Sequence, residues 1–380
     1  MSRFLFVVPP LTGHVNPTVS VARVLEARGH EVAWAAHPGT VKKLLPDGAR
    51  IFAMPEVANP GHVESVALRA KAVRGAAALK LLWEDFLIPL ARSMRPALEV
   101  CVTEFSPSVM ICDQQAVAGG LVARRRGLPW ATFATTSAGV VDPLAGLPQV
   151  KAWFDALIAS LETESGLPHH GEMSPQLVVA FTTEAMVGPL DRFPSHYRFV
   201  GPSISDRPEP TPFPWDRLAN TRRVLISMGT VNAEASGRFY ATAVEALRDE
   251  PLQMIIAAPD LQAPPPAIVQ SYLPQLALLP KLDAVVCHGG HNTTCEALAH
   301  GLPLVIAPIK DDQPIVADQV VAAGAGIRVK FGRVQAPELR AAVRRILDEP
   351  SFREAARRVQ ASFAAAGGAA AAATHVEALA

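Results

Sequence analysis

The sequence predicts an α/β protein made of two Rossmann-like domains, and three observations support this. Apolar runs that suit β-strands alternate with helical patterns from the start of the chain, an order that is typical of parallel sheets. A proline-rich stretch interrupts this alternation near the middle, and the alternation then begins again. The two halves also share one pattern: a strand, a turn with Gly and His, a helix, a Gly and a further strand.

In the first half, we expect a helix that begins at Pro17, because a proline costs nothing in the first turn, with Asn16 as the N-cap. Gly29 would end this helix, and Gly127 would end a second one over residues 116–126. The expected strands are residues 3–8, 31–36, 109–113 and 130–134.

The chain between residues 202 and 214 holds five prolines among polar residues, which predicts a stiff and extended linker. After it we expect strands at residues 223–227, 253–257, 284–287 and 303–307, and helices at residues 235–247 and 293–300. The predicted organisation is a first domain at 1–205, a linker at 206–220, a second domain at 221–362 and an Ala-rich helix or tail at 363–380.

Composition excludes several classes of function. Lys and Arg together number 35 and so do Asp and Glu, so no basic excess indicates nucleic acid or an anionic membrane as a partner. The apolar run at residues 4–8 stops at Pro9 without a cleavage site, which indicates a strand and not a signal peptide. No run approaches the roughly 18 apolar residues of a membrane span. We therefore expect a cytoplasmic protein without stable membrane insertion.

The cysteines form no C-x-x-C pair, and in the expected compartment they should be buried, reduced thiols. They are Cys101, Cys112, Cys287 and Cys295.

The segment from Cys287 to Glu296 concentrates the polar residues of the second half. It follows an expected strand, and Gly289 and Gly290 allow a close approach of the backbone to a ligand. The N-terminus of the next helix offers N–H groups and the positive end of a dipole, which suit a diphosphate. One turn further, the carboxylate of Glu296 can accept hydrogen bonds from ribose hydroxyls. A capped helix after a tight turn would explain the glycines and Thr293, but not the other polar residues.

His14 lies between the first expected strand and helix, at the carboxyl edge of the first sheet. Asp113 ends another strand of that sheet and can reach the same edge. An imidazole titrates near neutral pH and can remove a proton from a hydroxyl, while a carboxylate on its other nitrogen fixes the tautomer. The two residues are therefore candidates for a general base and its orienting partner. The alternatives are a turn or core role for His14 and a helix N-cap for Asp113.

Further motifs follow one another in a fixed order and spacing. They are Gly13-His14-Val15-Asn16-Pro17, Ser227-Met228-Gly229-Thr230, Tyr272-Leu273-Pro274-Gln275, Leu279-Pro280, His288-Gly289-Gly290, Glu296, Gly301-Leu302-Pro303 and Pro308-Ile309-Lys310-Asp311-Asp312-Gln313. With these motifs the chain resembles, over nearly its whole length, the inverting glycosyltransferase family of the GT-B fold. This family includes plant secondary-metabolite and bacterial antibiotic (macrolide) glycosyltransferases, and the N-terminal motif matches its bacterial branch.

The resemblance implies two Rossmann-like domains facing across a cleft and a metal-independent, inverting sugar transfer. The donor would be a TDP- or UDP-sugar, which is a co-substrate, and no cofactor is implied. The acceptor would be a hydroxyl of a small apolar or aromatic natural product, with His14 as base and Asp113 as orienter. In the donor site, Gly229 and Thr230 would lie near the phosphates, and the diphosphate would be held by His288, Gly290, Asn292 and Thr293. Glu296 and Gln275 would bind the ribose, and Asp312 and Gln313 the sugar hydroxyls. Tyr272, next to Leu273, stands where plant relatives have a Trp that stacks on the base.

No Asp-x-Asp follows a strand in a setting that would bridge a metal and a diphosphate, so no metal site is expected. One histidine and eight apolar residues between 60 and 100 are candidates either for an acceptor pocket or for ordinary core, and residues 140–147 for a loop beside that pocket. They are His62, Leu68, Leu81, Leu82, Trp83, Phe86, Leu87, Leu90 and Met94.

Two other functions stay open at this point: a non-catalytic homologue that binds or activates a partner, and a GT-B enzyme that acts on a lipid or cell-wall precursor. A nicotinamide dehydrogenase also has paired α/β halves, but no G-x-G-x-x-G follows a strand here. The sequence does not separate TDP from UDP, nor O-glycosylation from N-, S- or C-glycosylation. It identifies neither the sugar, the acceptor nor the oligomeric state.

Overall fold

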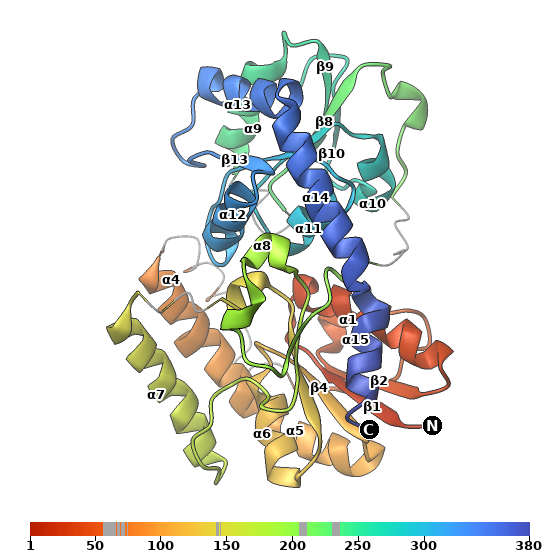
Figure 1. Ribbon diagram of the computed structural model, residues 1–380, viewed down its shortest axis with the longest axis vertical. Helices are drawn as coiled ribbons and strands as arrows, with labels where there is room; N and C mark the ends of the chain where they lie inside the picture. The colour runs from red at the N-terminus through yellow and green to blue at the C-terminus, as the bar shows by residue number, and fades with distance from the viewer. Residues whose placement is uncertain are drawn as a thin grey trace. The chain divides into compact units, whose positions relative to one another are not determined.

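The computed structural model describes residues 1–55, 66, 69, 73, 75–141, 144, 146–204, 211–229 and 236–380. The chain forms two compact units, each an α/β layer structure around its own sheet (Figure 1). The first unit comprises Met1–Thr183, Pro189–Ser205 and Ala366–Ala380, and the second comprises Glu184–Gly188 and Asp206–Ala365. Both termini of the chain therefore belong to the first unit.

The first unit contains a seven-stranded parallel sheet in the order β3-β2-β1-β4-β5-β6-β7. Its strands are β1 (Arg3–Val7), β2 (Glu31–Ala36), β3 (Ile51–Ala53), β4 (Val109–Asp113), β5 (Trp130–Ala134), β6 (Val178–Ala180) and β7 (Tyr197–Phe199). Its helices are α1 (Thr12–Ala27), α2 (Pro38–Val41), α4 (Ala76–Lys80), α5 (Ile88–Phe105), α6 (Val117–Arg126), α7 (Pro148–Glu164) and α15 (Gly368–Glu377), with a π-helical turn at Leu81–Leu87 before α5.

Helices cover both faces of this sheet, so the residues of its central strands are buried on both sides (Figure 1). Leu5 and Val7 of β1 pack in one hydrophobic cluster with α5 and α6. Phe4 and Phe6 point the other way, into a cluster that contains α1 and the last helix, α15. A continuous apolar run such as β1 is therefore the expected signature of a strand in this position.

The second unit contains a six-stranded parallel sheet in the order β10-β9-β8-β11-β12-β13. Its strands are β8 (Arg222–Ser227), β9 (Leu252–Ala257), β10 (Ile268–Gln270), β11 (Ala284–Cys287), β12 (Leu304–Ile306) and β13 (Gly326–Arg328). Its helices are α8 (Glu184–Val187), α9 (Gly237–Leu247), α10 (Gln275–Leu278), α11 (His291–Ala299), α12 (Gln313–Ala322), α13 (Ala336–Asp348) and α14 (Pro350–Ala366). One face of the sheet packs on α9 and α13.

The start of α1 differs from the sequence-based prediction. The helix begins at Thr12 and not at Pro17, and Leu11, not Asn16, is its N-cap. The first turn closes because the N–H groups of His14 and Val15 both donate to the carbonyl of Leu11, at 2.9 and 3.2 Å. Pro17 therefore lies inside the helix, and His14 lies in its first turn instead of the preceding loop.

The Ala-rich end of the chain is helical. Helix α14 stops at Ala366, Gly367 adopts a left-handed conformation with φ of 84°, and α15 follows at once. Ala372, Ala373 and Val376 of α15 are buried in the core of the first unit. High helix propensity and burial thus act together in this segment.

The expectation for the cysteines is confirmed, since all four are buried and free. Among the described residues, no helix combines the length and the apolar character that crossing a bilayer requires.

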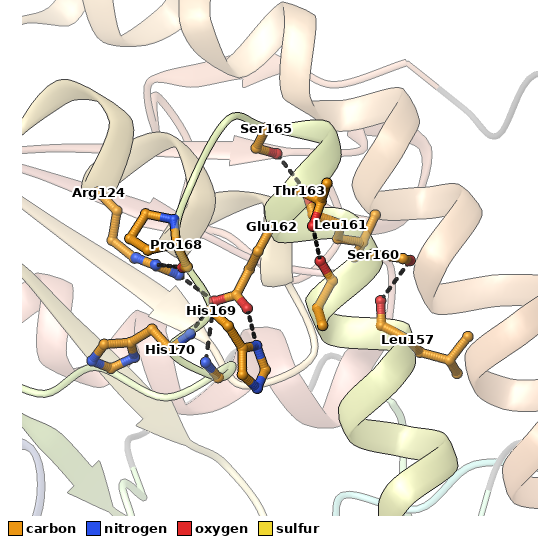
Figure 2. A network of polar contacts seen from close by, with 12 residues as sticks. Arg124, Leu157, Ser160, Leu161, Glu162, Thr163, Ser165, Pro168, His169 and His170 are labelled. Carbon is orange, nitrogen blue, oxygen red and sulfur yellow. Dashed lines mark hydrogen bonds and ion pairs between the residues drawn. The ribbon is translucent and has the colours of Figure 1, made fainter.

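A buried carboxylate, Glu162, ties α7 to the segment that follows it (Figure 2). Its side chain is 1 % exposed and accepts hydrogen bonds from Arg124 of α6, from Nδ1 of His169 at 2.6 Å and from the backbone N–H groups of His170 and Gly171 at 3.0 and 3.1 Å. Burial raises the pKa of this carboxyl, but the hydrogen bonds outweigh burial and hold its pKa below the usual value.

We expect Glu162→Gln to lower the free energy of unfolding by about 3–5 kcal/mol, because it leaves the largely buried guanidinium of Arg124 without its charge partner. Glu164→Gln is the matched control: it lies two residues further on α7, and its pair with Arg92 is largely exposed. That control should cost about 0–1 kcal/mol. Urea unfolding of both variants measures the difference.

The difference in stability between wild type and Glu162→Gln should depend on pH. A carboxyl with a lowered pKa in the folded state contributes stability above its unfolded pKa, and this contribution is lost as the pH falls through the folded value. The gap between wild type and Glu162→Gln should therefore narrow as the pH falls below the usual Glu value of 4.5. A gap that stayed constant down to pH 3 would contradict this role for the charge.

Candidate functional site

The carboxyl edge of the first sheet carries a His–Asp pair. His14 lies in the first turn of α1, and Asp113 is the last residue of β4. Nδ1 of His14 is 2.9 Å from Oδ1 and 3.0 Å from Oδ2 of Asp113. The Asp113 side chain is fully buried, whereas that of His14 is 15 % exposed. The structure therefore brings these two predicted residues together across 99 positions of sequence.

A third residue, Thr135, completes this cluster, and sequence reasoning missed it. It follows β5, and its hydroxyl is 2.6 Å from Oδ2 of Asp113 and 2.9 Å from Nδ1 of His14. Oδ1 of Asp113 also accepts the backbone N–H of Gln115 at 2.8 Å. The available signal was the run of polar residues after an apolar strand, at residues 135–137, because β5 neighbours β4 in the sheet.

The cluster lies where the strand order of the sheet reverses. From β1 the chain continues outward through β2 and β3, and then returns to the other side of β1 with β4. Ligands of open α/β sheets bind beyond the carboxyl ends of the strands at such a switch point. With Nδ1 directed at a carboxylate, the neutral imidazole keeps its proton on Nδ1 and has a lone pair on Nε2. This arrangement suits removal of a proton from a hydroxyl.

The second sheet has its switch point between β8 and β11, and the glycine-rich segments lie there. A Cβ on Gly229, shortly after β8, would come within 2.8 Å of the His288 ring, and one on Gly290 within 2.4 Å of its Nε2. The imidazole of His288, directly after β11, therefore fits only because both neighbours are glycines. Burial lowers the pKa of His288, although the nearby carboxylate of Asp312 acts in the opposite direction.

Helix α11 starts two residues before the predicted position, at His291, with Gly290 as its N-cap. The N–H of Thr294 donates to the carbonyl of Gly290 at 3.0 Å. Asn292 and Thr293 lie in the first turn of the helix, before Thr294. The backbone N–H groups of a first turn precede the first hydrogen bond within the helix and point toward its N-terminal end. The arrangement forms an anion-binding geometry beside His288.

Glu296 and Gln275, both predicted for the ribose, are in contact. Oε2 of the largely buried Glu296 accepts a hydrogen bond from Nε2 of Gln275 at 2.6 Å. Tyr272, which lies three residues before Gln275, is 64 % exposed, so its ring is open to a planar ligand. Leu273 is half-buried between them.

Asp312 and Gln313 lie at the start of α12. The side-chain oxygen of Gln313 accepts the backbone N–H groups of Ile309 and Lys310, at 2.8 and 3.1 Å. This fixes the carboxamide and directs its NH₂ group away from that loop. Thr230, also predicted for this site, lies outside the described residues.

The apolar residues proposed for an acceptor pocket belong to the core of the first unit. The described members are buried in the cluster on the α5 face or packed against it: Leu81, Leu82, Trp83, Phe86, Leu87, Leu90 and Met94. His62 and Leu68 lie outside the described residues, as do positions 142, 143 and 145 of the adjoining loop. Within the described parts of both units, no group of three or more His, Cys, Asp or Glu side chains is arranged to hold a metal ion.

Comparison with known proteins places the chain among glycosyltransferases. Residues 249–379 match the model of the erythromycin biosynthesis protein CIII-like C-terminal domain. The 4'-demethylrebeccamycin synthase of Lentzea aerocolonigenes is 30% identical, over 96% of this chain and 96% of its own. The demethyllactenocin mycarosyltransferase of Streptomyces fradiae is 29% identical, over 100% of this chain and 87% of its own.

Solved glycosyltransferase structures resemble this chain over nearly its whole length. The glycosyltransferase of kitacinnamycin superimposes with a TM-score of 0.78 at 26% identity, covering 100% of this chain and 98% of its own. A spinosyn rhamnosyltransferase complexed with thymidine diphosphate has a TM-score of 0.75 at 23% identity, covering 99% of this chain and 100% of its own. The chain therefore belongs to the family of macrolide and antibiotic glycosyltransferases and has the GT-B fold.

Proposed function

We propose that this glycosyltransferase moves a sugar from a TDP- or UDP-sugar to a hydroxyl of a small hydrophobic natural product, with inversion and without a metal. His14 is the general base and Asp113 its orienting partner. The acceptor binds to the first unit and the nucleotide sugar to the second. The nucleotide sugar is a co-substrate, and no other cofactor takes part.

The observation that carries this proposal is the contact of Nδ1 of His14 with both carboxylate oxygens of Asp113. An imidazole protonated on Nδ1 can take the proton of the acceptor hydroxyl on Nε2. The acceptor oxygen then bonds to the anomeric carbon while the bond from that carbon to the diphosphate breaks. An intact base–carboxylate pair favours an enzyme over a non-catalytic binding partner.

The departing diphosphate needs its negative charge stabilised, and the second unit supplies donors for it. The N-terminus of α11 and the ring of His288 lie at the switch point of the second sheet. Fixed donors of this kind act where charge develops in the transition state, which is the role that a metal has in other transferases. Glu296 with Gln275 would hold the ribose, Tyr272 would stack on the base, and Asp312 and Gln313 would hold the sugar.

The comparisons support this donor class and this acceptor class. One relative is by its name a demethyllactenocin mycarosyltransferase, and another is by its name a 4'-demethylrebeccamycin synthase. The spinosyn rhamnosyltransferase holds thymidine diphosphate in its structure.

Product analysis tests the proposed reaction. With α-linked TDP- and UDP-sugars and a panel of small hydroxylated aromatic acceptors, we expect a β-linked product, because a single displacement inverts the anomeric carbon. The coupling constant of the anomeric proton in NMR spectra reports the configuration. An α-linked product would exclude single displacement.

The same assay tests the absence of a metal from the mechanism. Turnover should persist in excess EDTA. A loss of turnover in EDTA that Mg²⁺ or Mn²⁺ restores would reveal a metal site.

Substitution of His14 tests its proposed role as the general base. His14→Ala should lower turnover by roughly 10²- to 10⁴-fold, the usual contribution of a general base. Asp113→Asn should have a smaller effect, since it removes orientation and charge but keeps the imidazole. Calorimetric titration with TDP is the control, and the affinity should be that of wild type in both variants. A His14→Ala variant with wild-type turnover would refute the proposed role.

Two glycine variants, one beside the His288 ring and one away from it, test the proposed diphosphate site. A Cβ in Gly290→Ala would lie 2.4 Å from Nε2 of His288, so the ring must move. We expect TDP affinity to fall by at least tenfold, the equivalent of one charge-assisted hydrogen bond of about 1.5–3 kcal/mol. Gly237→Ala, in the same unit, meets no atom within 4 Å and should bind TDP as wild type does. Equal affinities in the two variants would contradict the diphosphate site.

A further inference from the structure

The hydroxyl of Thr135 joins both members of the His–Asp pair, and no part of the proposed mechanism has yet used it. We propose that Thr135 is a positioning residue for the transfer reaction: it locks the Asp113 carboxylate in the rotamer that holds the His14 ring. This inference rests on the proposed role of His14 as the base.

The contacts define what the hydroxyl does. It donates its proton to Oδ2 of Asp113 at 2.6 Å, and its oxygen lies 2.9 Å from Nδ1 of His14. The opposite carboxylate oxygen, Oδ1, accepts the N–H of Gln115 at 2.8 Å. Each oxygen of Asp113 therefore has a donor besides the imidazole. Rotation of the carboxylate would break one of these bonds in a buried site, which is costly.

The sheet explains why the residue that follows β5 can reach the pair. Asp113, at the end of β4, is in register with Phe133 of β5, and the ladder extends one step further through the N–H of Gln114 and the carbonyl of Phe133. Thr135 follows two residues after Phe133, at the same edge, and is buried. A β-branched side chain has few χ1 rotamers, so its hydroxyl is fixed at low entropic cost.

Thr135 keeps its own proton during the reaction. The acceptor proton moves to Nε2 of His14, the proton on Nδ1 stays in place, and Asp113 stabilises the imidazolium as a carboxylate. A misplaced ring would still be a base, but its lone pair would not be directed at the acceptor hydroxyl. Loss of the hydroxyl should therefore reduce turnover without reducing donor binding.

Three variants of β5 and its end separate this role from a general effect on folding. Thr135→Val keeps the shape and removes the hydroxyl, and Thr135→Ser keeps the hydroxyl. Thr132→Val is the matched control, because Thr132 is a buried threonine of β5 whose hydroxyl accepts the N–H of Ser174 at 2.8 Å, away from the pair. We expect kcat to fall about 10- to 100-fold in Thr135→Val, with donor KM and TDP affinity unchanged. Thr135→Ser should recover most of this loss, and Thr132→Val should lose stability but not kcat.

The chemistry of the acceptor provides a second readout. An acidic acceptor such as 4-nitrophenol needs a base less than phenol does. The deficit of Thr135→Val should therefore shrink from phenol to 4-nitrophenol, whereas a merely structural defect would reduce both rates alike. An equal deficit on both acceptors would overturn the proposal.

A measurement without substrate completes the test. In the full-length protein labelled with ¹⁵N-histidine, the hydrogen-bonded Nδ1 proton of His14 should give a downfield NMR signal, which His14→Ala identifies by its loss. We expect this signal in Thr135→Ser and its broadening or loss in Thr135→Val and in Thr135→Ala, the second hydroxyl-free variant.

The two proposals fail in distinguishable ways. A Thr135→Val protein with the turnover and the Nδ1 signal of wild type overturns the role of Thr135, even where His14→Ala is inactive. Wild-type turnover of His14→Ala overturns the base itself, and with it the function on which this inference rests.

Discussion

Parallel strand pairing is the constraint on which the rest of this structure depends. Every strand pair in both sheets is parallel, so the carboxyl ends of all strands in a sheet emerge at the same edge. Where the strand order reverses, between β1 and β4 and between β8 and β11, adjacent connections leave toward opposite faces. Within each sheet, the polar residues that follow these two strands therefore lie close together at its carboxyl edge. A slip of one residue in the register would turn each of these side chains to the wrong face.

Eight of the thirteen described strands could be predicted from the sequence, and the five that were missed, β3, β6, β7, β10 and β13, have only three residues each. The bounds of β2, β4, β5 and β11 agree with the expected ones, because a strand buried on both faces is a short apolar run between turn residues. The starts of helices were less predictable: α1 begins at residue 12 and not 17, and α11 at residue 291 and not 293. In α1, a proline was interpreted as marking the first turn, but the tertiary structure accommodates it inside the helix.

The candidate site could be predicted one residue at a time but not as a cluster. His14 and Asp113 stood out because of their residue types at strand ends. Thr135 did not, because residues 135–137 are all small and polar, and only the pairing of β4 with β5 determines which of them reaches Asp113. The packing of glycines around His288 could likewise not be predicted from the sequence. The glycines were evident in the sequence, but the need for Gly229, 59 positions before the ring, comes from the pairing of β8 with β11.

The return of the chain to its first unit has a consequence for its synthesis. Helix α15 closes the face of α1: Glu377 pairs with Arg28 and, at 2.9 Å, with His30, while Ala372, Ala373 and Val376 fill the core beneath. A ribosome delivers these residues only after the whole second unit. The unit that carries His14 thus keeps an open apolar face while the second unit is synthesised, and it completes its core only when α15 has emerged. A chimaera that exchanges the two units between family members must accordingly keep residues Ala366–Ala380 with the N-terminal parent.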